Sequence, residues 1–152
     1  MSADDVDIRR RAVRAIAELP GSPAVTALLV DGLGDTDAAV RGRAALALGG
    51  RGVDAAVPIL VEMVVEGVND VEAAEILATL SQGPGRADGI MKALVDELAA
   101  PAASSAVRIR LAQALVEISG PLAQDVLRRL AHDDDRTVAL IASTLVELPA
   151  PG

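Results

Sequence analysis

The side chains that could do chemistry are few in this chain and form no recognisable catalytic constellation. The sequence has no Cys and a single His, His132, which is followed by Asp133-Asp134-Asp135. A specific transition-metal site needs more than one nitrogen or sulfur ligand, and carboxylates at a helix start are explained by capping and by the helix dipole. His132 is also the sole imidazole base for the serines, none of which lies in a Gly-x-Ser-x-Gly context. We therefore expect no metal, no cofactor and no enzymatic activity.

The charge of the chain is negative and unevenly distributed. The net charge is −8, and residues 53–100 carry two basic and nine acidic side chains, a net charge of −7. An acidic field repels phosphate backbones and favours a cationic partner. The sequence also lacks Phe, Tyr and Trp, so no aromatic side chain is available to stack on bases. These features argue against nucleic-acid binding.

The composition also bears on location. The first residues, Met1–Asp7, are acidic and polar, unlike a secretory signal peptide. No apolar run reaches the roughly 18 residues of a membrane-spanning helix. We expect a cytoplasmic protein that makes no membrane contact. Thirteen Arg against one Lys, with abundant Ala and Gly, favour a GC-rich bacterial source.

Three segments of the chain repeat one another. Residues 40–49 (VRGRAALALG) echo residues 8–17 (IRRRAVRAIA), and residues 107–115 (VRIRLAQAL) echo both. Their arginines Arg9, Arg41 and Arg108 are separated by 32 and then 67 residues, so the third copy lies about two periods further on. Self-similarity at this spacing predicts a stack of small units, none of which can bury its apolar face alone.

Each unit is predicted to contain two short helices. Capping residues such as Asp37 and Asp135 precede apolar residues at helical spacing, and Gly or Pro follows them. The first helices are expected near 5–19, 37–49, 70–81, 104–118 and 135–148, and the second near 23–33, 55–66, 89–99 and 121–131. The segment 81–89 is too rich in Gly to be helical and is predicted to be a flexible connector. The chain is thus one all-α domain, 1–152, with repeats at about 4–34, 35–67, 68–100, 101–132 and a half repeat at 133–149.

The second repeat carries the fullest form of a recurring motif. Its residues are Asp35, Asp37, Val40, Arg41, Ala44, Ala45, Ala47, Leu48 and Gly49, followed by Ala56-Val57-Pro58-Ile59-Leu60. This pattern resembles the HEAT-like repeats of the short bacterial type, also seen in phycobilisome-lyase-like proteins. The third repeat departs from it, because Glu72 stands roughly where Arg41 and Arg108 stand in their repeats.

The resemblance implies a right-handed α-solenoid of about four and a half repeats, with the second helices on the inner, concave side. It also implies that acidic residues pair with arginines along the stack. The residues expected in these structural pairs are Asp5, Arg9, Asp35, Asp37, Arg41 and Arg108.

If the second helices line a groove, their charged residues become the candidate binding surface. These residues are Glu62, Glu66, Asp96, Glu97, Arg128, Arg129 and His132. Glu62 and Glu66 are four residues apart and share one helix face. A partner segment with basic residues first and an acidic end would complement this surface. The alternative is a solvated face that keeps an Ala-rich protein in solution.

The last expected helix offers a second candidate surface. One stripe of it consists of Val138, Ile141, Leu145 and Leu148, and an exposed apolar patch is expected at this end. Such a stripe could support docking or self-association, unless local packing hides it.

These features favour a non-catalytic adaptor that binds another protein, with a basic partner segment, through the groove or the C-terminal helix. One alternative is a small-molecule-binding or catalytic accessory protein that uses the groove as an apolar pocket. A third interpretation is a homo-oligomeric structural module assembled through the C-terminal helix.

Overall fold

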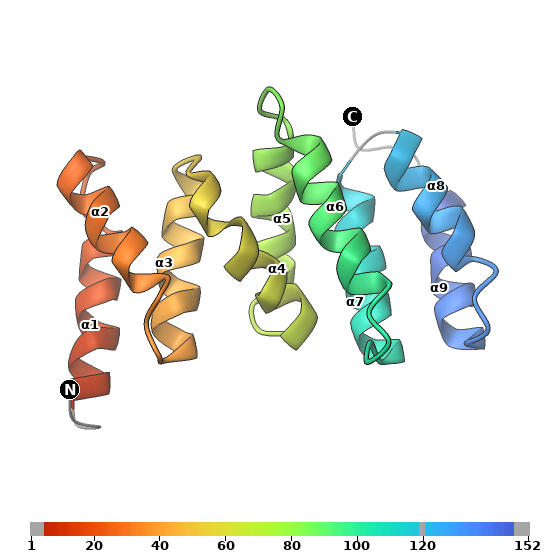
Figure 1. Ribbon diagram of the computed structural model, residues 1–152, viewed down its shortest axis with the longest axis horizontal. Coiled ribbons are helices and arrows are strands. Elements are labelled where there is room, and N and C mark those ends of the chain that lie inside the picture. Colours follow the sequence, from red (N-terminus) through yellow and green to blue (C-terminus); the bar gives the residue numbers. More distant parts are fainter. Residues whose placement is uncertain (1–4, 119–120, 148–152) are drawn as a thin grey trace. The chain divides into compact units, whose positions relative to one another are not determined.

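The fold is all-α in the part of the chain that the computed structural model describes, residues 5–118 and 121–147 (Figure 1). The helices are α1 (Asp5–Ala17), α2 (Pro23–Gly32), α3 (Ala38–Gly50), η1 (Asp54–Ala56, a 3-10 turn), α4 (Val57–Glu66), α5 (Asp70–Ser81), α6 (Ala87–Leu98), α7 (Ser105–Glu117), α8 (Pro121–Leu130) and α9 (Arg136–Glu147). Turns and bends connect them, and the described residues form no strand. The all-α prediction is therefore confirmed.

Side-chain caps explain where several of these helices begin. Ser22 Oγ accepts a hydrogen bond from the Val25 N–H at 3.2 Å, and Pro23 occupies the first position of α2. Asp37 caps α3 and Ser104 caps α7 in the same way. A cap satisfies a backbone N–H that has no partner inside the helix. This is why the capping residues in the sequence locate the helix starts to within a few residues.

The segment after α5 differs from the sequence expectation. Residues 87–89 belong to the first turn of α6, so the connector is shorter than the predicted 81–89. The Ile90 N–H donates to the Arg86 carbonyl at 3.2 Å, and Ile90, Met91 and Leu94 are buried. Tertiary burial of these three side chains outweighs the low intrinsic helix propensity of Gly89.

The chain divides into two compact units, residues 1–60 and 61–152. In the first unit α1 packs on α2 and α3, α2 packs on α3, and α3 also contacts η1. Its core includes Val13, Leu29, Leu48 and the fully buried pair Ala44 and Ala45. Small side chains such as these let helix backbones approach closely.

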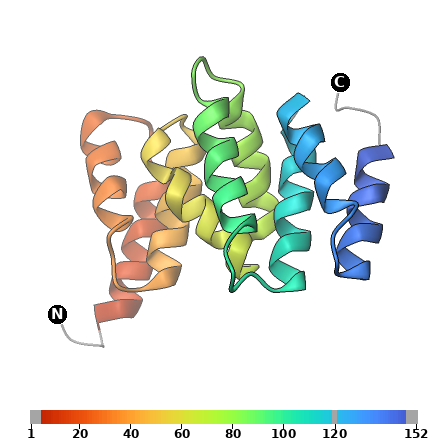
Figure 2. The same cartoon turned by 45° about the vertical axis from the view of Figure 1, so that its right-hand side comes forward.

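Within the second unit, α5–α9 pack in a similar way. The first helices of successive repeats pack on one another, α5 on α7 and α7 on α9, and the second helices α6 and α8 are also in contact. Figure 2 shows α5 and α6 lying side by side as a hairpin. Leucines fill the core: Leu77, Leu94, Leu111, Leu115 and Leu127 are all fully buried. None of the buried residues in the described ranges is polar or charged.

Arginine side chains close two of the helix C-termini. Arg51 Nη2 donates to the carbonyls of Ala17 and Leu19, at 2.8 and 2.7 Å, just beyond the end of α1. Arg110 Nε donates to the Val64 carbonyl at 2.9 Å, and its Nη2 donates to the Val65 carbonyl at 2.5 Å. The last carbonyls of a helix have no internal partner, and a cation there also complements the helix dipole. These two arginines therefore have structural roles.

No helix among the described residues combines the length and the apolar character needed to cross a bilayer.

The turn that follows α4 gives a test of this packing. Gly67 has a φ of +73°, and a Cβ at this position would lie 3.1 Å from the Arg110 Cζ. We expect Gly67→Ala to lower the free energy of unfolding by about 1–2 kcal/mol, because an L side chain is strained in this conformation. The measurement is the urea midpoint followed by circular dichroism.

The matched control is Gly89→Ala in α6 of the same unit, where a Cβ would meet nothing within 4 Å. This change should leave stability unchanged or raise it by about 0.5–1 kcal/mol. Equal stability of Gly67→Ala and wild type would contradict the strain argument.

Candidate functional site

An ionic link ties the first repeat to the turn that starts the second. Arg9 Nε donates to Asp35 Oδ2 at 2.9 Å, and Arg9 Nη2 donates to Asp35 Oδ1 at 3.2 Å. Arg10 forms a second two-point contact, to Asp37, with distances of 2.9 and 2.8 Å. The two aspartates also order their own turn, because the Asp37 N–H donates to Asp35 Oδ1 and the Val40 N–H donates to Asp37 Oδ2. We call this arrangement the Asp-x-Asp clasp.

The second unit contains a clasp of the same design. Arg108 Nη1 donates to Asp133 Oδ2 at 3.0 Å, and the Asp135 N–H donates to Asp133 Oδ1 at 2.9 Å. Asp135 caps α9 by accepting from the N–H groups of Thr137 and Val138. The Ser105 hydroxyl donates to Asp135, in the place that Arg10 takes in the first unit. A clasp therefore joins α1 to the start of α3 in the first unit, and α7 to the start of α9 in the second.

The clasps shift the acidity of their carboxyl groups. The Arg10 guanidinium, aided by the Val40 N–H, lowers the pKa of Asp37 from 3.8 to about 2. The Asp37 N–H and then Arg9 lower the pKa of Asp35. In the second unit the Ser105 hydroxyl and then the Val138 N–H lower the pKa of Asp135. Each shift favours the ionised carboxylate, which is the form that the clasp uses.

Two further residues, Arg41 and Asp5, are expected from the sequence to take part in Asp–Arg pairs. Arg41 donates through Nη1 to the carbonyls of Asp35 and Thr36, at 3.0 and 3.1 Å. Asp5 lies in the first turn of α1, where an acidic side chain complements the helix dipole. Arg41 thus braces the turn of its own repeat, whereas Arg9 reaches from one repeat to the next.

The charged residues predicted to line a groove lie in or next to the second helices of the second unit. Glu62 and Glu66 are on α4, Asp96 and Glu97 on α6, Arg128 and Arg129 on α8, and His132 follows α8. Glu62 and Glu97 are half-buried and the other five are exposed. Asp96 accepts from Lys92 at 2.8 Å, which raises the pKa of Lys92, and Arg128 donates to Asp125 at 3.2 Å. Part of the charge expected on this surface is therefore compensated within its own helix.

The predicted apolar stripe on the last helix is not an open surface. Val138 is only 1% exposed, and Ile141 and Leu145 are half-buried, because this side of α9 packs on α7 and α8. Leu148 lies outside the described residues. Leu140, elsewhere on α9, is exposed at 68%. The expectation of an exposed stripe that includes Val138 is therefore wrong.

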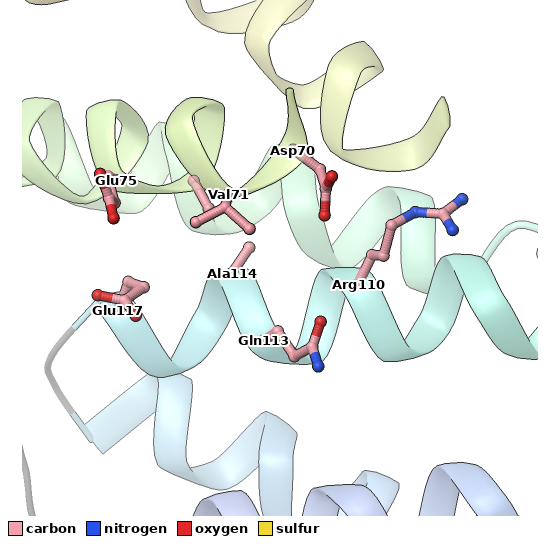
Figure 3. A pocket seen from close by; sticks show the side chains of 8 residues that line it. Asp70, Val71, Glu75, Arg110, Gln113, Ala114 and Glu117 are labelled. Carbon is pink, nitrogen blue, oxygen red and sulfur yellow. The ribbon is translucent and has the colours of Figure 1, made fainter. Parts of the chain in front are cut away.

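A groove lies between the first helices α5 and α7 of the second unit (Figure 3). Its volume is about 210 Å³, and its lining residues are Asp70, Val71, Ala74, Glu75, Arg110, Gln113, Ala114 and Glu117. The small side chains of Ala74 and Ala114, 8% and 1% exposed, leave the space between the two helices open. Val71 stands on the side of the groove and is 68% exposed. The groove therefore combines an apolar base with charged edges.

The carboxylates at one end of this groove have no cationic partner among the residues that the structure describes. Glu75 on α5 and Glu117 on α7 lie across the groove from each other (Figure 3). Within the described ranges neither carboxylate forms an ion pair or a side-chain hydrogen bond. Arg110, the cation in the lining, points toward the other end and bonds the α4 carbonyls. The negative charge of Glu75 and Glu117 is therefore available to a ligand.

Sequence reasoning placed the binding surface on the second helices and missed this groove. The excess of acidic residues in 53–100 was a correct signal for the charge, but Glu117 lies outside that segment. No group of three or more His, Asp or Glu side chains in the described ranges is arranged to hold a metal ion.

The clasp predicts an acid-dependent loss of stability. The ionised Asp37 contributes stability above about pH 4, and this contribution disappears as the pH falls through about 2, since the unfolded carboxyl has the higher pKa. Asp37→Asn keeps an N-cap but removes the charge. We expect the urea midpoint of this variant to fall less between pH 5 and pH 2 than that of wild type.

The control for this titration is Asp134→Asn, which removes an exposed charge outside the clasps. Its urea midpoint should fall between pH 5 and pH 2 as much as that of wild type. If the urea midpoint of Asp37→Asn also fell as much as that of wild type, the role assigned to the Arg10–Asp37 pair would be contradicted.

A second comparison tests the clasp of the second unit. Asp133→Ala removes the acceptor for Arg108 and for the Asp135 N–H, and we expect a loss of about 1–3 kcal/mol in unfolding free energy. Asp125→Ala removes the exposed partner of Arg128 and should cost less than about 0.5 kcal/mol. Urea denaturation of both variants measures the difference, and equal losses would contradict a special role for the clasp.

Comparison with known proteins agrees with this architecture. A family model described as HEAT repeats matches residues 1–81, somewhat more than half of the chain. No curated protein matches the sequence. The matched segment runs from α1 through α5 and includes the clasp of the first unit. The chain therefore belongs to the HEAT repeat family, an all-α solenoid class.

Proposed function

We propose that this protein is a non-catalytic scaffold that binds a protein partner carrying a basic segment. HEAT repeats commonly mediate protein–protein interaction. The observation that supports a basic partner is the surplus of negative charge in residues 53–100, which contain nine acidic and two basic side chains. One of those two, Lys92, is already paired with Asp96. Basic side chains of this segment are too few to balance its acidic ones, which favours a partner that brings positive charge.

The second helices supply one contact surface for such a partner. Glu66 and Asp96 are exposed there, and Glu62 and Glu97 are half-buried beside them on the same helices. Arg128, Arg129 and His132 are exposed further along the chain and would take an acidic part of the partner. Opposite charges of this kind set the orientation of a complex and raise its association rate.

The composition sets the strength of the complex. Tyr and Trp are the usual anchors of tight interfaces, and this chain has neither. We expect a modest affinity that depends strongly on salt, because exposed charges are screened within about 8–10 Å at physiological ionic strength.

The test compares baits in a lysate of the source organism, with the retained proteins identified by mass spectrometry. Glu66→Lys/Asp96→Lys reverses two exposed charges of the second helices. A partner held by wild type should be lost from this variant, and its sequence should contain a basic segment. Raising the salt concentration should release the same partner from wild type.

Glu18→Lys/Asp134→Lys is the matched control, because it makes the same change in net charge at two exposed positions outside the second helices. It should retain the partner. Equal retention by all three baits would exclude the second helices as the contact surface, and a wild type that retains no protein would contradict the scaffold function.

A further inference from the structure

The groove between α5 and α7 has the size of a receptor for one side chain. Its volume of about 210 Å³ is below the roughly 300–1,000 Å³ of sites that bind small molecules. Its base is made by Ala74 and Ala114, with Val71 exposed at one side. A long aliphatic stem fits such a base, because it covers apolar surface while its polar end remains outside.

The charges at the edge of the groove select what that polar end must be. Glu75 and Glu117 approach the groove from opposite helices and have no partner in the described part of the chain (Figure 3). Two carboxylates facing one space repel each other, and a cation between them removes this cost. A phosphate or a carboxylate would add to the repulsion. The complementary group is therefore cationic.

Arg110 does not fill this role. Its guanidinium bonds the carbonyls of Val64 and Val65 and is turned away from Glu75 and Glu117 (Figure 3). Moving it into the groove would leave the C-terminus of α4 without its cap. The cation must come from another molecule.

We propose that this groove binds an arginine side chain from the partner's basic segment. The stem lies over Val71 and Ala114, and the guanidinium lies between Glu75 and Glu117. Arginine fits better than lysine because its planar fork can donate to two separate carboxylates at once. This inference rests on the proposed function and adds a contact for one arginine of the basic segment on the first helices α5 and α7 to the contacts proposed on the second helices.

The experiment is an NMR titration of ¹⁵N-labelled protein at low salt with acetyl-Ala-Arg-Ala-Arg-Ala-Arg-Ala-amide. We expect the largest amide shifts at Val71, Glu75, Gln113 and Glu117. Glu75→Gln/Glu117→Gln should weaken binding by about tenfold or more, the scale of a lost charge-assisted contact. Asp88→Asn/Asp134→Asn removes the same net charge elsewhere and should change the affinity less than about twofold.

Two further measurements separate a shaped groove from general attraction to an acidic surface. Val71→Ala, a change at an exposed position, should weaken binding severalfold although no charge is altered. The same peptide with citrulline in place of arginine should not bind, and a lysine version should bind more weakly than the arginine peptide. Equal binding by Glu75→Gln/Glu117→Gln and wild type would overturn the proposal.

The failure of this proposal can be told apart from the failure of the proposed function. If Glu66→Gln/Asp96→Asn weakens peptide binding and the groove variant does not, the basic segment binds the second helices and only the groove assignment is wrong. If wild type binds no arginine peptide at millimolar concentration, both the groove assignment and the basic partner are wrong.

Discussion

The interaction on which each unit depends is the bond between a cation of one first helix and the Asp-x-Asp turn that begins the next. In the first unit the same two carboxylates accept from Arg9 and Arg10 and from the backbone N–H groups of their own turn. The contacts within a helix hairpin do not fix its position relative to the next hairpin. The clasp fixes this position, because the aspartates of the turn that caps a helix also accept hydrogen bonds from the preceding first helix. The start of the helix in one repeat and its attachment to the preceding repeat thus depend on the same carboxylate groups.

The second constraint is a core without aromatic rings. Alanines occupy the contacts between helices, and leucines fill the interior of each unit. Small residues allow close approach of the backbones, but they leave space wherever two neighbouring positions are both small. Ala74 and Ala114 are such a pair, and the groove between α5 and α7 lies above them. The feature that makes these repeats pack therefore also produces the hollow that we propose binds a partner.

Most of the fold could be predicted from the sequence because its signals are local. Capping residues, helical spacing and Gly or Pro punctuation located the helices within a few residues, including α5, which begins at Asp70 and ends at Ser81 as expected. The start of α6 was missed because burial of Ile90 and Met91 outweighs the loop-like composition before them. The site was less predictable. Which side of α9 is covered and which side of α5 stays open depend on how the helices pack on one another, and helical spacing does not encode this.

The clasp also restricts where such a protein can change in length. The turn at residues 35–37 must place one carboxylate under Arg9 and the other at the cap of α3, two residues later. An insertion or deletion of one residue there would disrupt both the Asp37 cap of α3 and the Arg9–Asp35 ion pair. The connector between α5 and α6 is not constrained by a cap in this way, since the residue before α6, Arg86, makes no side-chain capping hydrogen bond. Insertions and deletions among relatives should therefore gather inside the hairpins, while the turns between clasped repeats keep a constant length.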